Sequence, residues 1–144
     1  MELKIDYITE DEITDIFSRY LEGKGWEIVS RAMGHSRGAD IVAKRNGKIF
    51  CVEAKGGGSQ TKGTNRFGKP FTRLQCQIHT DAAFASLPRM MSRYSPDFVG
   101  LILPDDPHHK ESVSEIFLAI KKLEAGIWLI NRDNVTSLFD PTDQ

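Results

Sequence analysis

The sequence predicts one α/β domain built on a mixed β-sheet, with helices covering both faces. A length of 144 residues suits a single domain. Hydrophobic residues make up 40% of the chain and charged residues 27%, which is typical of a globular protein. Segments with helical spacing of apolar residues alternate with short apolar runs. The expected order is helix, three strands, helix, strand, helix, strand.

The first helix is expected to begin near Thr9. Thr9 and Glu12 form a capping box, in which each side chain accepts a hydrogen bond from the backbone N–H of the other residue. Gly23 and Gly25 are residues that commonly end a helix. The segment 26–31 that follows has the composition of a strand.

The next two strands are expected to form a hairpin. Residues 39–45 and 48–54 are β-rich runs separated by Asn46 and Gly47. Asn-Gly between two such runs is the strongest short-range hairpin signal, because both residues of the turn must accept a positive φ.

A loop and a long helix follow the hairpin. Residues 56–70 contain five glycines among polar residues, which predicts a loop. Pro70 suits the start of a helix that runs to about Tyr94, with a break expected at Pro88.

The C-terminal part is expected to add a strand, a helix and a last strand. Residues 98–103 form an apolar run typical of a buried strand. Ser112 and Glu115 form a second capping box before a helix that Gly126 would end, and 127–131 is the last strand predicted. His108 and His109 are expected in an exposed turn before this helix.

Charge is distributed unevenly along the chain. The formal net charge is -1, but residues 31–73 carry 10 basic and 2 acidic residues, a net +8. Such asymmetry indicates a polyanionic partner. Asp40 and Glu53 are the two acids of this basic segment.

The hairpin turn sets the positions of these two acids. Arg45 should face Lys48, so Asp40 should face Glu53 across the ladder, with Lys55 on the same side of the sheet. Opposed like charges destabilise a sheet unless something compensates them. Mg²⁺ takes one or two carboxylates, water and phosphate oxygens, and such a site can hydrolyse a phosphodiester with Lys55 orienting the attacking water. The alternative is a solvated carboxylate pair with Lys55 as its neutralising partner.

These residues resemble the PD-(D/E)XK nuclease superfamily, which has the restriction endonuclease-like fold. The resemblance rests on Gly38-Ala39-Asp40-Ile41-Val42 and on Cys51-Val52-Glu53-Ala54-Lys55-Gly56, and it extends over about residues 8–104. Ala39 stands where the family's name places proline. The resemblance implies an αβββαβ core, here with a C-terminal helix–strand extension, and a site in which Asp40 and Glu53 bind Mg²⁺, for which Mn²⁺ would substitute.

The resemblance also implies supporting residues on two helices. An acidic residue of the first helix often completes the metal site. Glu12 is the candidate, with Glu10 and Asp15 as rivals, and Glu12 also has its capping role. A polar residue of the next helix, commonly Gln, often lies beside the site. Gln75 is the candidate, with a solvated helix face as the alternative; His79 shares that face.

The sequence therefore predicts a magnesium-dependent endodeoxyribonuclease. Phosphate contacts are expected from a set of basic residues: Arg37, Lys62, Arg66, Lys69 and Arg73. The alternatives are a catalytically silent DNA-binding or interaction module and a nuclease that acts on RNA. The acidic N-terminus lacks a signal segment and no run is long enough for a membrane span, so a cytoplasmic protein is expected. Specificity for a particular DNA target is expected to come from a homodimer or from a partner subunit.

Overall fold

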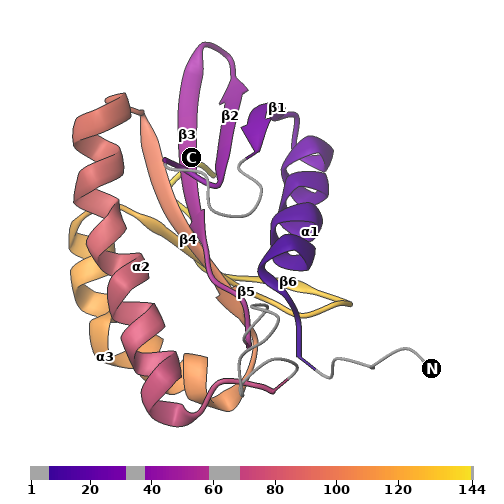
Figure 1. Ribbon diagram of the computed structural model, residues 1–144. Coiled ribbons are helices and arrows are strands. Elements are labelled where there is room, and N and C mark those ends of the chain that lie inside the picture. The colour runs from indigo at the N-terminus through magenta and orange to yellow at the C-terminus, as the bar shows by residue number, and fades with distance from the viewer. Residues whose placement is uncertain (1–6, 32–37, 59–68, 144) are drawn as a thin grey trace.

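The chain forms an α/β structure with three helices and a mixed six-stranded sheet, as expected (Figure 1). The computed structural model describes residues 7–31, 38–58 and 69–143. The elements are α1 (Glu10–Gly23), β1 (Glu27–Arg31), β2 (Ile41–Arg45), β3 (Lys48–Ala54), α2 (Arg73–Tyr94), β4 (Phe98–Pro104), α3 (Pro107–Lys122), β5 (Gly126–Ile130) and β6 (Val135–Phe139).

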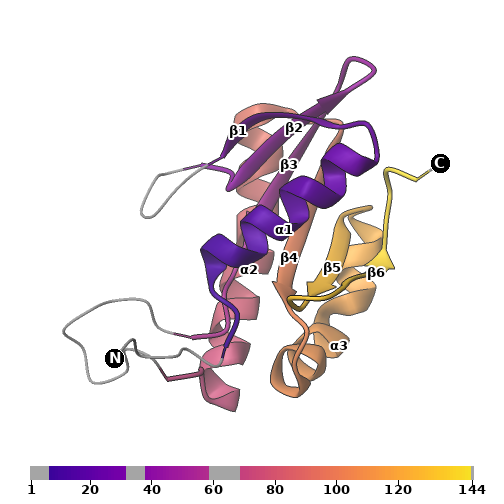
Figure 2. The ribbon, with the colours of Figure 1, turned by 90° about the vertical axis from the view of Figure 1, so that its right-hand side faces the viewer.

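The strands lie in the sheet in their chain order. β1, β2 and β3 are antiparallel neighbours, β4 and β5 add in parallel, and β6 returns antiparallel to β5. Parallel neighbours need a crossover connection, which α2 and α3 supply. In Figure 2, α1 lies in front of the strands and α2 behind them, so the two faces of the sheet are covered by different helices.

Two apolar layers hold the helices on the sheet. On the α1 side, Phe17 packs against Phe50 and Trp128, with ring centroids 6.4 and 4.9 Å apart. On the other side, Leu87 of α2 and Ile120 of α3 are fully buried against the sheet. Phe50 and Val52 face α1, whereas Cys51 faces α2, which is the alternation expected of β3.

The predicted hairpin is confirmed in turn and register. Asn46 and Gly47 have φ values of 54° and 77°, so both occupy the left-handed region that the turn requires. The ladder runs from Arg45 opposite Lys48 to Ile41 opposite Val52.

The helix starts were predicted with mixed success. The Thr9 capping box of α1 is confirmed. α2 begins at Arg73 rather than Pro70, because Thr72 is its N-cap and forms a capping box with Gln75. The helix also continues through Pro88, where a break was expected.

The C-terminal part differs more from the prediction. α3 begins at Pro107, with Asp106 as its N-cap, so the expected start at Ser112 is wrong. His109 therefore lies in the first turn of α3 and is fully buried, rather than in an exposed turn. β6 was not predicted, because its central residues are exposed and it has no run of apolar residues.

None of the helices within the described ranges has the length and apolar character needed to cross a membrane.

Replacing Gly100 with alanine should destabilise the fold. A Cβ on Gly100 would lie 2.7 Å from the Trp128 ring and 3.1 Å from the Phe50 ring, and both rings are held by core packing. We expect Gly100→Ala to lower the free energy of unfolding by about 1–3 kcal/mol in a urea titration. Gly23→Ala is the control, because a Cβ there meets nothing within 4 Å. Equal stability of the two variants would contradict this packing.

Candidate active site

Asp40 lies just before β2 and is held against the end of β3. Its N–H donates to the Val52 carbonyl at 2.9 Å, one residue out of step with the ladder, in which Val52 pairs with Ile41. Its carboxylate accepts a hydrogen bond from the Ala54 N–H at 2.7 Å. The regular ladder therefore ends at Ile41 and Val52, one pair before the predicted pairing of Asp40 with Glu53. The hydrogen bond from the Ala54 N–H fixes the Asp40 carboxylate instead.

Glu53 and Lys55 meet this carboxylate from β3 and the residue just after it. The carboxyl group of Glu53 lies beside that of Asp40, whose charge acts on it. The Lys55 Nζ lies 3.5 Å from Glu53 Oε1, and both side chains are less than one quarter exposed. The structure thus brings Asp40, Glu53 and Lys55 together, as the sequence predicted.

A third carboxylate comes from the first turn of α1, and it belongs to Glu10. The backbone at Glu10 packs so closely on Gly56 that a Cβ on Gly56 would lie 2.6 Å from the Glu10 nitrogen. This approach places Glu10 next to the end of β3, where the charges of Asp40 and Lys55 act on it. Glu10 was a rival candidate in the sequence, and the geometry favours it over Glu12.

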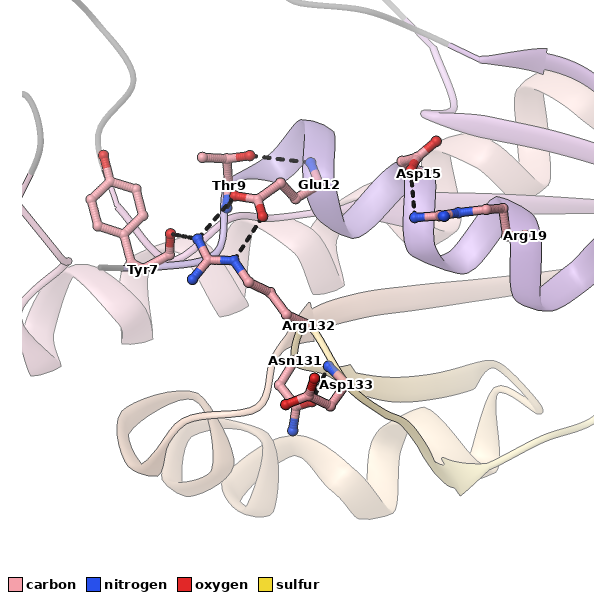
Figure 3. A network of polar contacts seen from close by, with 8 residues as sticks. All are labelled: Tyr7, Thr9, Glu12, Asp15, Arg19, Asn131, Arg132 and Asp133. Carbon is pink, nitrogen blue, oxygen red and sulfur yellow. Dashed lines mark hydrogen bonds and ion pairs between the residues drawn. The ribbon is translucent and has the colours of Figure 1, made fainter. Parts of the chain in front are cut away.

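The side chain of Glu12 belongs to a network with Arg132 and Thr9 (Figure 3). Its carboxylate accepts hydrogen bonds from Arg132, at 2.8 and 3.2 Å, and from the Thr9 N–H at 3.2 Å. Arg132 also donates to the Tyr7 carbonyl at 3.0 Å. Glu12 therefore serves to tie the start of α1 to the turn after β5. Asp15, the other rival, pairs with Arg19 one helical turn further on (Figure 3).

The electrostatics of the site are dominated by buried carboxylates. Burial raises the pKa of Glu53 to about 7, and the charge of Asp40 adds to the effect. Burial raises the pKa of Glu10 to about 7 in the same way. The pKa of Asp40 is also raised by burial, although the hydrogen bond from the Ala54 N–H opposes the shift. All three carboxyl groups resist ionisation. A nearby cation is therefore needed if all three are to be negatively charged at the same time.

A tyrosine at the end of α2 holds the approach to Asp40. The Tyr94 hydroxyl accepts a hydrogen bond from the Ala39 N–H at 3.2 Å. Gly38 has φ +109°, and a Cβ there would collide with this hydroxyl. Glycine is therefore required both for its backbone conformation and for the space it leaves. Nothing in the sequence pattern linked Tyr94 to residues so distant in the chain.

The α2 residues expected beside the site have structural partners on their own side of the molecule. The Gln75 side chain accepts a hydrogen bond from the Thr72 N–H at 2.9 Å as part of the capping box. His79 stacks on Phe71 with ring centroids 4.3 Å apart. Burial lowers the pKa of His79, and the charge of Lys55 lowers it further, so His79 senses the site electrostatically.

The basic residues named from the sequence are only partly described. Arg37, Lys62 and Arg66 lie outside the described residues. Lys69 is exposed just before α2, and Arg73 forms an ion pair with Glu111 of α3.

A second group of potential ligands lies at the start of α3. Donor atoms of Cys76, Asp106 and His109 all lie within 4.8 Å of one another. The His109 Nδ1 is 2.8 and 2.9 Å from the two Asp106 oxygens, and Asp106 also accepts the His109 N–H as the N-cap. Capping of α3 accounts for the contact between Asp106 and His109, and a donor set with thiol and imidazole favours Zn²⁺ over Mg²⁺.

No family model, curated protein or solved structure matches the chain. The geometry of the site therefore carries the functional interpretation. The oxygen donors of Glu10, Asp40 and Glu53 are the ligand type that a hard cation such as Mg²⁺ prefers, so the residues present fit such an ion.

The raised carboxyl pKa values predict how stability depends on pH. Between pH 4.5 and about 7, Glu53 binds a proton in the folded state that it releases in the unfolded state. The free energy of unfolding should therefore fall as pH rises through this range. In EDTA, Glu53→Gln should remove part of this fall and be more stable than the wild type at pH 8, on the order of 1–3 kcal/mol.

The free energy of unfolding is measured by urea titration at a series of pH values, and Glu12→Gln is the matched control. Arg132 lowers the pKa of Glu12, so that ion pair stabilises the fold at neutral pH and is lost on acidification. Glu12→Gln should therefore bring no gain at pH 8. A Glu53→Gln protein that follows the pH profile of the wild type would contradict the burial of this carboxyl group.

Proposed function

We propose that the chain is a metal-dependent nuclease that hydrolyses phosphodiester bonds of DNA. One observation carries the proposal. Carboxyl groups from α1, from the turn before β2 and from β3 converge beside Lys55 at the end of a buried strand. A group of like charges in partial burial is costly to maintain, and perturbed carboxyl pKa values are typical of functional sites.

In the proposed site, Asp40, Glu53 and Glu10 hold Mg²⁺ or Mn²⁺. A bound ion of this kind would acidify a water molecule and offset the negative charge that develops on the phosphate. The hydrogen bond from the Ala54 N–H fixes the orientation of the Asp40 carboxylate that would bind the ion. Lys55 is held by Glu53, so its ammonium group can orient the attacking water and neutralise a phosphate oxygen.

The fold supports this proposal through the order of its elements. α1, the antiparallel strands β1–β3, the crossover helix α2 and the parallel strand β4 follow the αβββαβ order of the restriction endonuclease-like core. We propose that residues 8–104 form such a core. α3, β5 and β6 then extend the sheet beyond it.

The proposal predicts which carboxylates the reaction needs. Cleavage of a labelled DNA duplex with Mg²⁺ or Mn²⁺ should fall on the order of 10²–10³-fold or more in Asp40→Asn and Lys55→Ala. Cleavage by the Glu10→Gln variant should fall strongly as well. Glu12→Gln is the control, because its side chain faces Arg132, and it should keep activity within a few-fold.

Outcomes that overturn this assignment are simple to recognise. Undiminished cleavage by Lys55→Ala would exclude its proposed role. A larger loss of cleavage activity in Glu12→Gln than in Glu10→Gln would indicate that Glu12, rather than Glu10, is the third metal ligand. An RNA of the same sequence, incubated in parallel, identifies an RNA-directed nuclease. DNA binding that survives Asp40→Ala, with no metal bound and no cleavage, identifies a silent binding module.

A further inference from the structure

A groove runs beside the candidate site along the second half of α2. It has a volume of about 890 Å³, and its wall includes Gly38, Glu53 and Tyr94. Glu53 thus belongs both to the carboxylate group and to the groove. A molecule lying in the groove would have direct access to the carboxylates.

Two arginines of α2 line this groove. Arg89 and Arg93 are four residues apart, so they lie on the same face of the helix, about one turn apart. Arg93 Nη1 is 3.7 Å from the position that a Cβ on Gly38 would occupy, so this guanidinium lies against the chain that leads to Asp40.

These arginines differ from the other arginines that the structure describes. The others each hold a carboxylate or a backbone carbonyl: Arg19, Arg31, Arg45, Arg73 and Arg132. Within the described residues, neither Arg89 nor Arg93 has a hydrogen-bond or ion-pair partner. Like charges four residues apart weaken a helix, although Arg93, in the last turn of α2, interacts favourably with the helix dipole.

We propose that Arg89 and Arg93 form a phosphate clamp for a nucleic-acid strand entering the site. The proposal rests on the proposed function, because it supplies the substrate-binding surface for the same carboxylates. Two guanidinium groups on one helix face match neighbouring phosphates of a strand, and arginine binds phosphate oxygens in a bidentate manner. The carboxylates beyond Glu53 repel a bare phosphate, so cations are needed where the strand approaches.

The clamp replaces part of the surface predicted from the sequence. Arg73 was expected to contact phosphates, but its guanidinium is held by Glu111. Arg89 and Arg93 lie outside the basic segment 31–73 and in a stretch where acidic residues predominate. The helix brings them to the site from there, which charge counting along the chain does not reveal.

The test compares Arg89→Gln/Arg93→Gln with Lys121→Gln/Lys122→Gln. The control removes the same charge from exposed residues at the end of α3. The measurement is fluorescence anisotropy of a labelled DNA duplex in EDTA, where metal-dependent cleavage does not run, across a range of salt concentrations. The arginine variant should bind on the order of tenfold more weakly, and its slope of log affinity against log salt should fall by about 1.8.

Two further measurements separate binding from folding and catalysis. With Mg²⁺, the arginine variant should raise KM and leave kcat close to that of the wild type. Binding of Mn²⁺ by calorimetry should be unchanged. Arg89→Lys/Arg93→Lys keeps the charge, so it should restore the salt slope while recovering only part of the affinity.

Each outcome bears on one of the two proposals. Wild-type affinity and salt slope in the arginine variant would overturn the clamp and leave the nuclease proposal intact. A wild-type chain that binds DNA through these arginines but neither binds metal nor cleaves would overturn the nuclease proposal and keep the clamp. A wild-type chain that binds no nucleic acid would overturn the clamp.

Discussion

Burial of like charges at the end of β3 is the constraint on which the rest of the structure depends. Glu53 follows a run of buried residues, and its largely buried carboxyl group lies beside that of Asp40, whose charge raises its pKa further. Glu10 adds a third acid from the opposite helix layer. Such a group lowers the stability of the metal-free fold above neutral pH, because the ionised forms are poorly solvated and repel one another. A bound divalent cation would offset both costs.

Much of the surrounding structure serves to hold this group in place. Tyr94 and Gly38 secure the chain before Asp40 from the α2 side. Arg132 and Glu12 secure the start of α1 from the turn after β5, and Glu10 lies in that first turn. The exposed ion pair by itself is worth little energy, so its value lies in orientation rather than in stability. The site is thus positioned from three separate parts of the chain.

The sequence was informative where the determining interactions are local. The Asn46-Gly47 turn and the alternation of side chains predicted that Asp40, Glu53 and Lys55 lie close together, and the structure places them side by side. The choice between Glu10 and Glu12 was not local. It depends on Arg132, which is 120 residues from Glu12 in the chain.

Other misses have similar physical reasons. The exposed position predicted for His109 is wrong because Asp106 and Pro107 begin α3, as N-cap and first residue, rather than forming a turn. The exposed strand β6 joins the sheet by pairing with β5, and its own side chains give little apolar signal. Arg89 and Arg93 lie outside the basic segment 31–73 and reach the site through the length of α2, so charge counting along the chain does not place them there.

The central claim is that these three carboxylates hold a divalent cation. The most direct measurement is anomalous diffraction from crystals of the protein soaked with Mn²⁺. We expect a peak within coordination distance of the Asp40 and Glu53 oxygens, with Glu10 beside it, and loss of that peak in Asp40→Asn. Absence of a peak there at saturating Mn²⁺, or a peak confined to Cys76 and His109, would contradict the account.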